Sequence, residues 1–182
     1  YIKDAMELFE QLKRDENLRV NTRVLNALVE LHTNALRVDE LDANILPLYD
    51  KHKVKPDVYT YQRLAKMYFN LAEYDLVKNL YLDLKKEPKD SASAIKPNQM
   101  LFDSVLQAAG RTNDAEVVYS ALTDFIEIKQ EPHFRCLNTL NNMKHIPDRL
   151  YVLLRENVGW SGQMTRRTRE FELPTFREKP SR

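Results

Sequence analysis

Apolar residues recur every three to four positions along most of the chain, which is the spacing of amphipathic helices. The clearest stretch predicts a helix from about Val58 to Asn70, a break at 71–73, and a second helix from about Tyr74 to Lys86. The apolar stripe that we expect to be buried in this pair of helices comprises Tyr61, Leu64, Ala65 and Tyr68 in the first helix and Leu76, Leu80 and Leu84 in the second.

A similar residue pair opens several of these helical stretches. Pro56-Asp57 is followed by Pro97-Asn98 and Pro132-His133 at spacings of 41 and 35 residues, and Val20-Asn21 lies 36 residues before the first pair. A period near 35 residues is typical of helical repeats, in which each unit contributes two helices. The pattern therefore predicts an all-α solenoid with complete units at 22–57, 58–98 and 99–133, and with partial units at 1–21 and 134–157.

Proline and glycine predict where several helices end or bend. Pro47 lies inside the second helix of the first unit and should kink it or delay its start, and Pro88 should end the helix before it. Gly110 is a candidate C-cap, and Asn113 or Asp114 should cap the helix that follows.

Composition agrees with a helical fold but does not determine the kind of binding partner. Only 3 of 182 residues are glycine and 30% are charged, while the net charge of +1 neither implies nor excludes a nucleic-acid partner. The single cysteine, Cys136, favours a reducing compartment. No apolar run is long enough to predict a membrane span. Because Tyr1 stands inside a helical pattern, we expect the chain to be the C-terminal part of a longer protein.

The stretch PDVYTYQRLAKMYFNLAEYDLVKNLYLDLKK resembles a pentatricopeptide repeat, and DAMELFEQLKRD resembles the second helix of the same motif. The resemblance covers residues 1 to about 157. It is closer than the resemblance to tetratricopeptide repeats, whose Trp-Leu-Gly-Tyr pattern is absent. It implies an α-solenoid whose first helices line a concave face and whose RNA-binding members read one base per repeat.

The resemblance also implies which residues would meet RNA. In the family, the fifth and the last residue of a unit hydrogen-bond the base edge, and the second residue packs against base faces. The fifth and last residues here are Asn26 with Asp57, Gln62 with Asn98, Asp103 with His133, and Asn138 in the last partial unit. Asn26 with Asp57 is a pair that favours uracil in the family, whereas the other two pairs are unfamiliar. The second positions are Arg23, Tyr59, Met100 and Arg135, among which Tyr59 is a candidate base or partner contact.

Catalytic chemistry has no support in the sequence. A zinc deaminase of the kind fused to some repeat proteins needs a His-x-Glu and a Cys-x-x-Cys motif, which one cysteine cannot supply. The four histidines lack the spacing of metal ligands, and the acidic residues fall on helix faces. We therefore expect no enzyme activity, no metal or other cofactor, and no small-molecule substrate.

The last segment, 158–182, differs from the rest. From Gly159 onward it holds six Lys or Arg against three Glu and has no helical stripe after about Met164. Such a composition predicts an extended basic tail that does not fold by itself. Its candidate contacts with phosphate are Arg166, Arg167 and Arg169, since guanidinium groups pair with phosphate oxygens, and its candidate apolar anchors are Trp160, Phe171 and Phe176.

These features together predict a non-catalytic, RNA-associated helical-repeat protein of an organelle. We expect a structural component of a mitochondrial ribosome or its assembly intermediate, with ribosomal or messenger RNA and other protein subunits as partners and the mitochondrial matrix, or else the chloroplast, as location. One alternative is a sequence-specific factor for the processing, stability or editing of organellar RNA. Another is a protein-binding adaptor of tetratricopeptide type without RNA.

Overall fold

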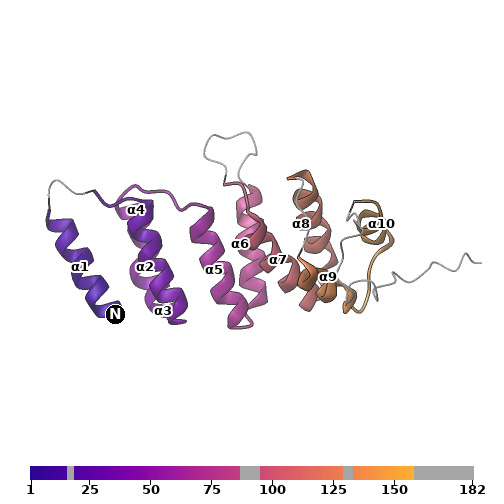
Figure 1. Cartoon of the computed structure of the whole chain (residues 1–182), viewed down its shortest axis with the longest axis horizontal. Coiled ribbons are helices and arrows are strands. Elements are labelled where there is room, and N and C mark those ends of the chain that lie inside the picture. Colours follow the sequence, from indigo (N-terminus) through magenta and orange to yellow (C-terminus); the bar gives the residue numbers. More distant parts are fainter. Residues whose placement is uncertain (16–18, 87–94, 129–132, 158–182) are drawn as a thin grey trace, which may run out of the picture.

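The computed structural model describes residues 1–15, 19–86, 95–128 and 133–157, and over these residues the chain is all-helical. The predicted basic tail lies outside them. Figure 1 shows the helices lined up along the long axis of the molecule, with α1 at one end and α10 at the other. The elements are α1 (Ile2–Arg14), α2 (Thr22–Asn34), α3 (Val38–Glu40), the π-helical turn η1 (Leu41–Ile45), α4 (Pro47–Lys51), α5 (Val58–Asn70), α6 (Tyr74–Lys86), α7 (Gln99–Arg111), α8 (Ala115–Glu127), α9 (Phe134–Asn141) and α10 (Asp148–Asn157).

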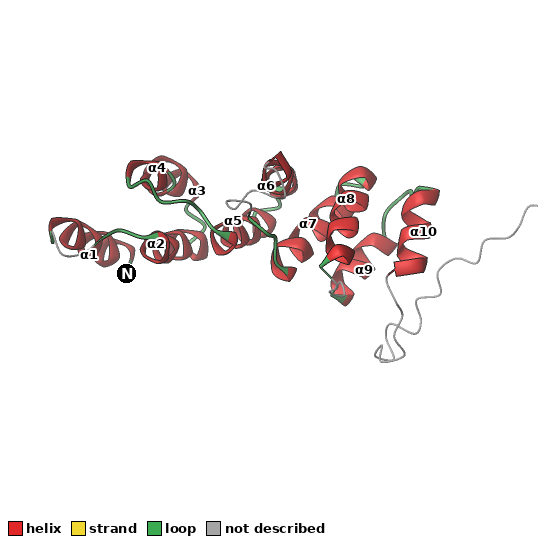
Figure 2. Cartoon of the chain, turned by 90° about the horizontal axis from the view of Figure 1, so that it is seen from above, coloured by secondary structure: helices red, strands yellow, loops and turns green. Residues whose placement is uncertain are grey.

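The helices form two layers, which are clearest in Figure 2. The first-helix layer contains α2, α5, α7 and α9, in which α5 packs between α2 and α7, and α7 packs against α9. The second layer contains the short α3–η1–α4 segment followed by α6, α8 and α10. This arrangement is the predicted all-α solenoid.

The hydrophobic core runs continuously between the layers. At its centre the ring of Phe102 in α7 meets Tyr81 in α6 and Phe125 in α8, with ring centroids 6.1 and 5.2 Å apart. All three rings are buried. Burial of such large side chains on successive helices stabilises each unit through its neighbours rather than through a core of its own.

A repeated turn joins the two helices of each complete unit. Its residue with positive φ is Leu36, Ala72 or Asn113, which is the fifteenth residue of the respective unit. The next residue donates its backbone N–H to a carbonyl five positions earlier, as in a Schellman motif. These bonds join Arg37 to His32, Glu73 to Tyr68 and Asp114 to Ala109. The same turn at the same position gives the three complete units the same entry into their second helices.

The bend predicted at Pro47 takes the form of a π-turn. The N–H of Leu46 donates to the carbonyl of Leu41 at 2.9 Å, and α4 then begins at Pro47. A proline has no N–H for a helical bond, so the wider turn ends directly before it. The π-turn also adds one residue to the path of this second helix.

Two local predictions are wrong. The buried face of α6 consists of Val77, Tyr81 and Leu84, whereas the side chain of Leu76, predicted to be buried, is 40% exposed. The helix contacts both α5 and α7, so its buried stripe is rotated from the one that the leucines alone suggested. Gly110 is not a C-cap, because α7 continues to Arg111 and Thr112 is the C-cap. By contrast, Asp114 caps α8 as predicted, since its carboxylate accepts the N–H of Val117.

None of the described helices is both long enough and apolar enough to cross a lipid bilayer.

Candidate nucleic-acid interface

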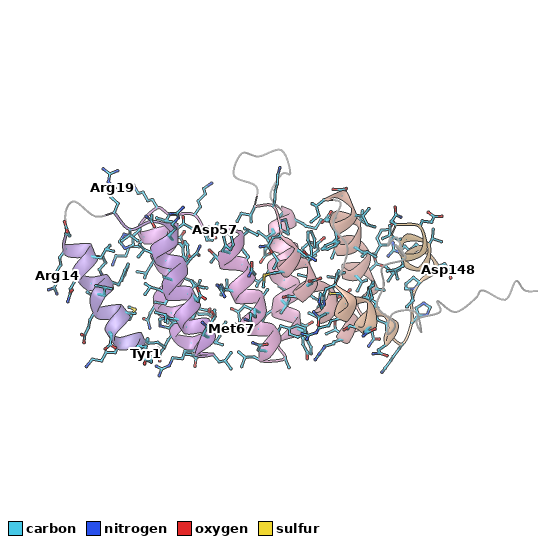
Figure 3. The ribbon with its side chains drawn as sticks, viewed as in Figure 1. Tyr1, Arg14, Arg19, Asp57, Met67 and Asp148 are labelled. Carbon is cyan, nitrogen blue, oxygen red and sulfur yellow. The ribbon has the colours of Figure 1, made fainter. Side chains whose placement is uncertain are left out.

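The fifth and the last residue of the first unit lie in direct contact. Asn26 on α2 donates from Nδ2 to Oδ1 of Asp57 at 2.9 Å. Figure 3 shows Asp57 at the N-terminal end of α5. Both side chains are half-buried. A pair that is 31 residues apart in sequence is thus brought together at the junction of two units.

The corresponding residues of the next two units also meet. Asn98 donates from Nδ2 to Oε1 of Gln62 at 2.9 Å, and the backbone N–H of His133 lies 3.3 Å from Oδ1 of Asp103. All three complete units therefore juxtapose their fifth and last residues, although the residue types differ.

Helix capping explains why the last residue of each unit is held in place. Each one is the N-cap of the next first helix, where a side-chain acceptor satisfies backbone N–H groups that have no helical partner. Asp57 accepts from Tyr59 and Thr60, Asn98 accepts from Leu101, and the ring of His133 accepts from Arg135. The capping requirement fixes these residues beside the preceding first helix, within reach of its fifth residue.

The second residue of each unit is exposed in the same layer. The side chains of Tyr59 and Met100 are 61% and 55% exposed, and those of Arg23 and Arg135 are exposed as well. Tyr59 and Met100 stand at corresponding positions of neighbouring helices. Their exposure is unfavourable, because burial of either side chain would lower the free energy of the folded state. Flat or flexible apolar side chains of this kind can stack on bases.

Gln62 and Asp103 differ from Asn26 in their surroundings. Gln62 is only 7% exposed, and its Nε2 lies 3.2 Å from Sδ of Met100. Asp103 accepts the thiol of Cys136 at 3.0 Å as well as the N–H of His133. Burial and the nearby Asp103 carboxylate raise the pKa of Cys136, so this thiol stays protonated. No sequence pattern indicated that Cys136 would contact a candidate base-reading residue.

Two further residues support the first pair and were not predicted. The hydroxyls of Tyr49 on α4 and Thr60 on α5 donate to Oδ1 of Asn26 at 2.8 and 2.5 Å. Thr60 also accepts the backbone N–H of Asp57 and completes a capping box. The Asp-x-x-Thr spacing at 57–60 could have indicated Thr60. No short-range pattern could have indicated Tyr49, which lies 23 residues from Asn26.

A polar hollow of about 170 Å³ lies at the C-terminal ends of α2 and α5. It contains two cationic side chains, Arg63 and Lys66, of which Arg63 is already paired with Glu30 at 2.8 Å. The remaining lining residues are Thr33, Asn34, Leu36, Met67 and Asn70. Figure 3 shows Met67 and Asp57 toward opposite ends of α5, so the hollow and the first pair are separate features.

The remaining candidate residues are Asn138 and those of the tail. Asn138 on α9 is exposed. The tail candidates, Trp160, Arg166, Arg167, Arg169, Phe171 and Phe176, lie outside the described residues. Among the described residues, no three His, Cys, Asp or Glu side chains are placed to hold a metal ion. His32 is buried, and its Nδ1 lies 2.8 Å from the carbonyl of Leu28, which fits a structural role.

Comparison with known proteins finds similar sequences among proteins that contain pentatricopeptide repeats. No protein-family model matches the sequence. The pentatricopeptide repeat-containing protein At5g48730 of Arabidopsis thaliana, a chloroplastic protein, is 28% identical over 107 residues, or 59% of this chain and 20% of its own length. A second chloroplastic protein of this kind from the same plant, At3g06430, is 25% identical over 122 residues, or 67% of this chain and 24% of its own length. The chain thus spans only about a fifth to a quarter of the length of these relatives.

A solved structure shows the same fold. The pentatricopeptide repeat domain of Arabidopsis thaliana protein-only RNase P 1, in complex with tRNA, superposes with a TM-score of 0.64 over 93% of this chain and 86% of that one, at 17% identity. The matching sequences and the shared solenoid fold together show that this chain is similar to proteins with pentatricopeptide repeats.

Proposed function

We propose that the chain binds single-stranded RNA along its first-helix layer, with one base at each junction between units. The observation that carries this proposal is the contact between the fifth and the last residue in all three complete units. Side chains that reach a shared edge at regular intervals suit the reading of successive unstacked bases. The tRNA bound to the structurally similar domain adds support from a protein with the same fold.

The first unit offers the most complete reading site. One N–H of the Asn26 amide and Oδ2 of Asp57 make no hydrogen bond within the described part of the chain. A donor beside an acceptor can pair with the O4 and N3–H groups of uracil, the base that the family resemblance assigns to this pair. The exposed ring of Tyr59 is the neighbouring surface on which that base would stack.

Binding of the 182-residue chain to uridine and adenosine homopolymers tests this proposal. Asn26→Ala should weaken binding to the uridine polymer by about 1–3 kcal/mol and leave binding to the adenosine polymer unchanged. Asn79→Ala, an exposed asparagine on α6 in the second layer, serves as the matched control and should change neither. Equal losses on both polymers would argue against base reading, and absence of binding to either polymer would refute the proposed function.

An organelle is the proposed location. Both chloroplastic relatives favour the chloroplast alternative, and the mitochondrial matrix stays a prediction. Within an organelle, three consecutive contacts between a fifth and a last residue favour a factor for RNA processing, stability or editing. A structural role in a mitochondrial ribosome, with other protein subunits as partners, also stays a prediction.

Cross-linking by ultraviolet light in the native assembly, followed by mass spectrometry of the linked peptides, separates these roles. Cross-links at Asn26, Tyr59 or Gln62 would support RNA reading by the first-helix layer. Cross-links confined to Arg166, Arg167 and Arg169 would instead support a scaffold that contacts RNA through its tail.

A further inference from the structure

We infer that Tyr49, a residue of the second layer, is a positioning residue that sets the base preference of the first unit. This inference rests on the proposed RNA-binding function. Tyr49 is 2% exposed and cannot touch a base itself, yet its hydroxyl donates to Oδ1 of Asn26 at 2.8 Å. It therefore acts on the RNA through the orientation of the Asn26 amide.

The surrounding bonds determine which way the amide faces. The Asp57 carboxylate can only accept, so the group 2.9 Å from it must be Nδ2 of Asn26. Oδ1 then faces the hydroxyls of Tyr49 and Thr60. Because both lone-pair directions of Oδ1 are occupied by donors, only the remaining N–H is available to a base. A flipped amide would present two acceptors next to each other, which would no longer match uracil.

The π-turn is what brings Tyr49 to this position. In α6 the buried residues Val77, Tyr81 and Leu84 are spaced by four and three, and in α8 Val118, Leu122 and Phe125 repeat that spacing. In the first unit the buried residues Leu41, Ile45 and Tyr49 are spaced by four and four. The extra residue of the π-turn accounts for this difference in spacing. Tyr49 therefore occupies in the first unit the position that Leu84 holds in the second unit and Phe125 in the third.

The correspondence makes Tyr49 unusual among the three complete units. Leu84 and Phe125 have no polar group to offer to the fifth residue of their own units, whereas Tyr49 adds a hydroxyl at the same place. Burial raises the pKa of Tyr49 to about 12, so the hydroxyl remains a donor at physiological pH. The first unit alone among these three combines a π-turn, a buried hydroxyl and a donor–acceptor pair.

Tyr49→Phe tests the inference. The ring is kept and phenylalanine already fills the corresponding place at Phe125, so the variant should fold. Tyr81→Phe is the matched control, since it removes a buried hydroxyl that bonds to Asp124 rather than to a candidate base-reading residue. Both variants are compared with the unaltered chain on uridine and adenosine homopolymers, at a temperature where circular dichroism shows full folding.

We expect Tyr49→Phe to reduce the preference for uridine over adenosine by about three- to tenfold, with Tyr81→Phe unchanged. In nuclear magnetic resonance spectra of the free protein, hydrogen exchange of the Asn26 side-chain amide should also become faster in Tyr49→Phe only. An unchanged preference and an unchanged exchange rate would overturn the inference while leaving RNA binding intact. Failure of the unaltered chain to bind either polymer would instead refute the proposed function together with this inference.

Discussion

The hydroxyl of Tyr81 in α6 donates a hydrogen bond of 2.6 Å to Oδ2 of Asp124 in α8, which joins the second helices of two successive units. The same carboxylate oxygen lies 2.9 Å from Nζ of Lys85. A hydrogen bond from a buried phenol hydroxyl to an ionised carboxylate is stronger than a hydrogen bond between two neutral groups. Contacts of this kind hold neighbouring units in one register in a solenoid.

Removal of this hydroxyl should weaken the stack of units. We expect Tyr81→Phe to lower the free energy of unfolding by about 1.5–3 kcal/mol, the usual contribution of a hydrogen bond to a charged group. Urea unfolding followed by circular dichroism measures this loss. Tyr59→Phe is the control, because the exposed Tyr59 side chain should tolerate the change within about 0.5 kcal/mol. Equal stability of the two variants would show that the bond contributes nothing.

Close approach of α7 and α9 explains the glycine within α7. A Cβ added at Gly110 would lie 2.9 Å from Cγ2 of Thr139. Inside a helix, replacement of glycine by alanine normally increases the stability by about 1 kcal/mol. Here the steric overlap with Thr139 should outweigh that increase. We expect Gly110→Ala to destabilise the chain by about 1–3 kcal/mol in thermal or urea unfolding.

A second substitution checks the cause. Thr139→Ser removes the methyl group that the new Cβ would meet, so Gly110→Ala combined with Thr139→Ser should recover most of the lost stability. Thr139→Ser alone should have a small effect. A Gly110→Ala variant at least as stable as the unaltered chain would contradict the steric explanation.

The buried tyrosines predict a loss of stability in alkali. Burial raises the pKa of Tyr49 from 10.0 to about 12 and also raises that of Tyr81. Because the pKa of each tyrosine is higher in the folded state than in the unfolded state, the unfolded chain releases a proton above pH 10 that the folded chain keeps. The free energy of unfolding should therefore fall by about 1.4 kcal/mol per pH unit for Tyr49 between pH 10 and 12.

Urea titrations from pH 8 to 12 measure this slope. Tyr49→Phe should make the slope less steep, because the variant keeps Tyr81 but has no titrating group at position 49, while Tyr59→Phe should leave the slope unchanged. A slope that is the same in Tyr49→Phe and in the unaltered chain would count against the assignment.

The basic tail makes a separate prediction about RNA affinity. If Arg166, Arg167 and Arg169 contact phosphates, deletion of residues 163–182 should weaken binding to both homopolymers and reduce the dependence of log affinity on log salt concentration. The preference for uridine should persist, because Asn26 and Asp57 are retained. Salt titrations of binding provide the measurement, and an unchanged slope would exclude a phosphate-binding role for the tail.

Local sequence determined the helices and their repetition. The 3.6-residue periodicity of 58–86 predicted α5 and α6 with their observed limits, since helix formation depends on interactions within a few residues. The residues Asp57, Asn98 and His133 were recognisable because a similar residue pair opens each helical stretch, and the structure shows that each residue is the N-cap of the following helix. Their pairing with fifth residues followed from the family resemblance, and the structure places each pair within hydrogen-bond distance.

Only the tertiary structure decided how the helices face one another. Leu76 of α6 is exposed and Gly110 lies inside α7, because the packing of neighbouring helices sets which stripe is buried and how closely backbones approach. The contact of Tyr49 with Asn26 depends on one extra residue in a π-turn and on the placement of α4 over α2 and α5. Such long-range contacts leave no periodic trace in the sequence, since each needs the packed arrangement of several helices at once.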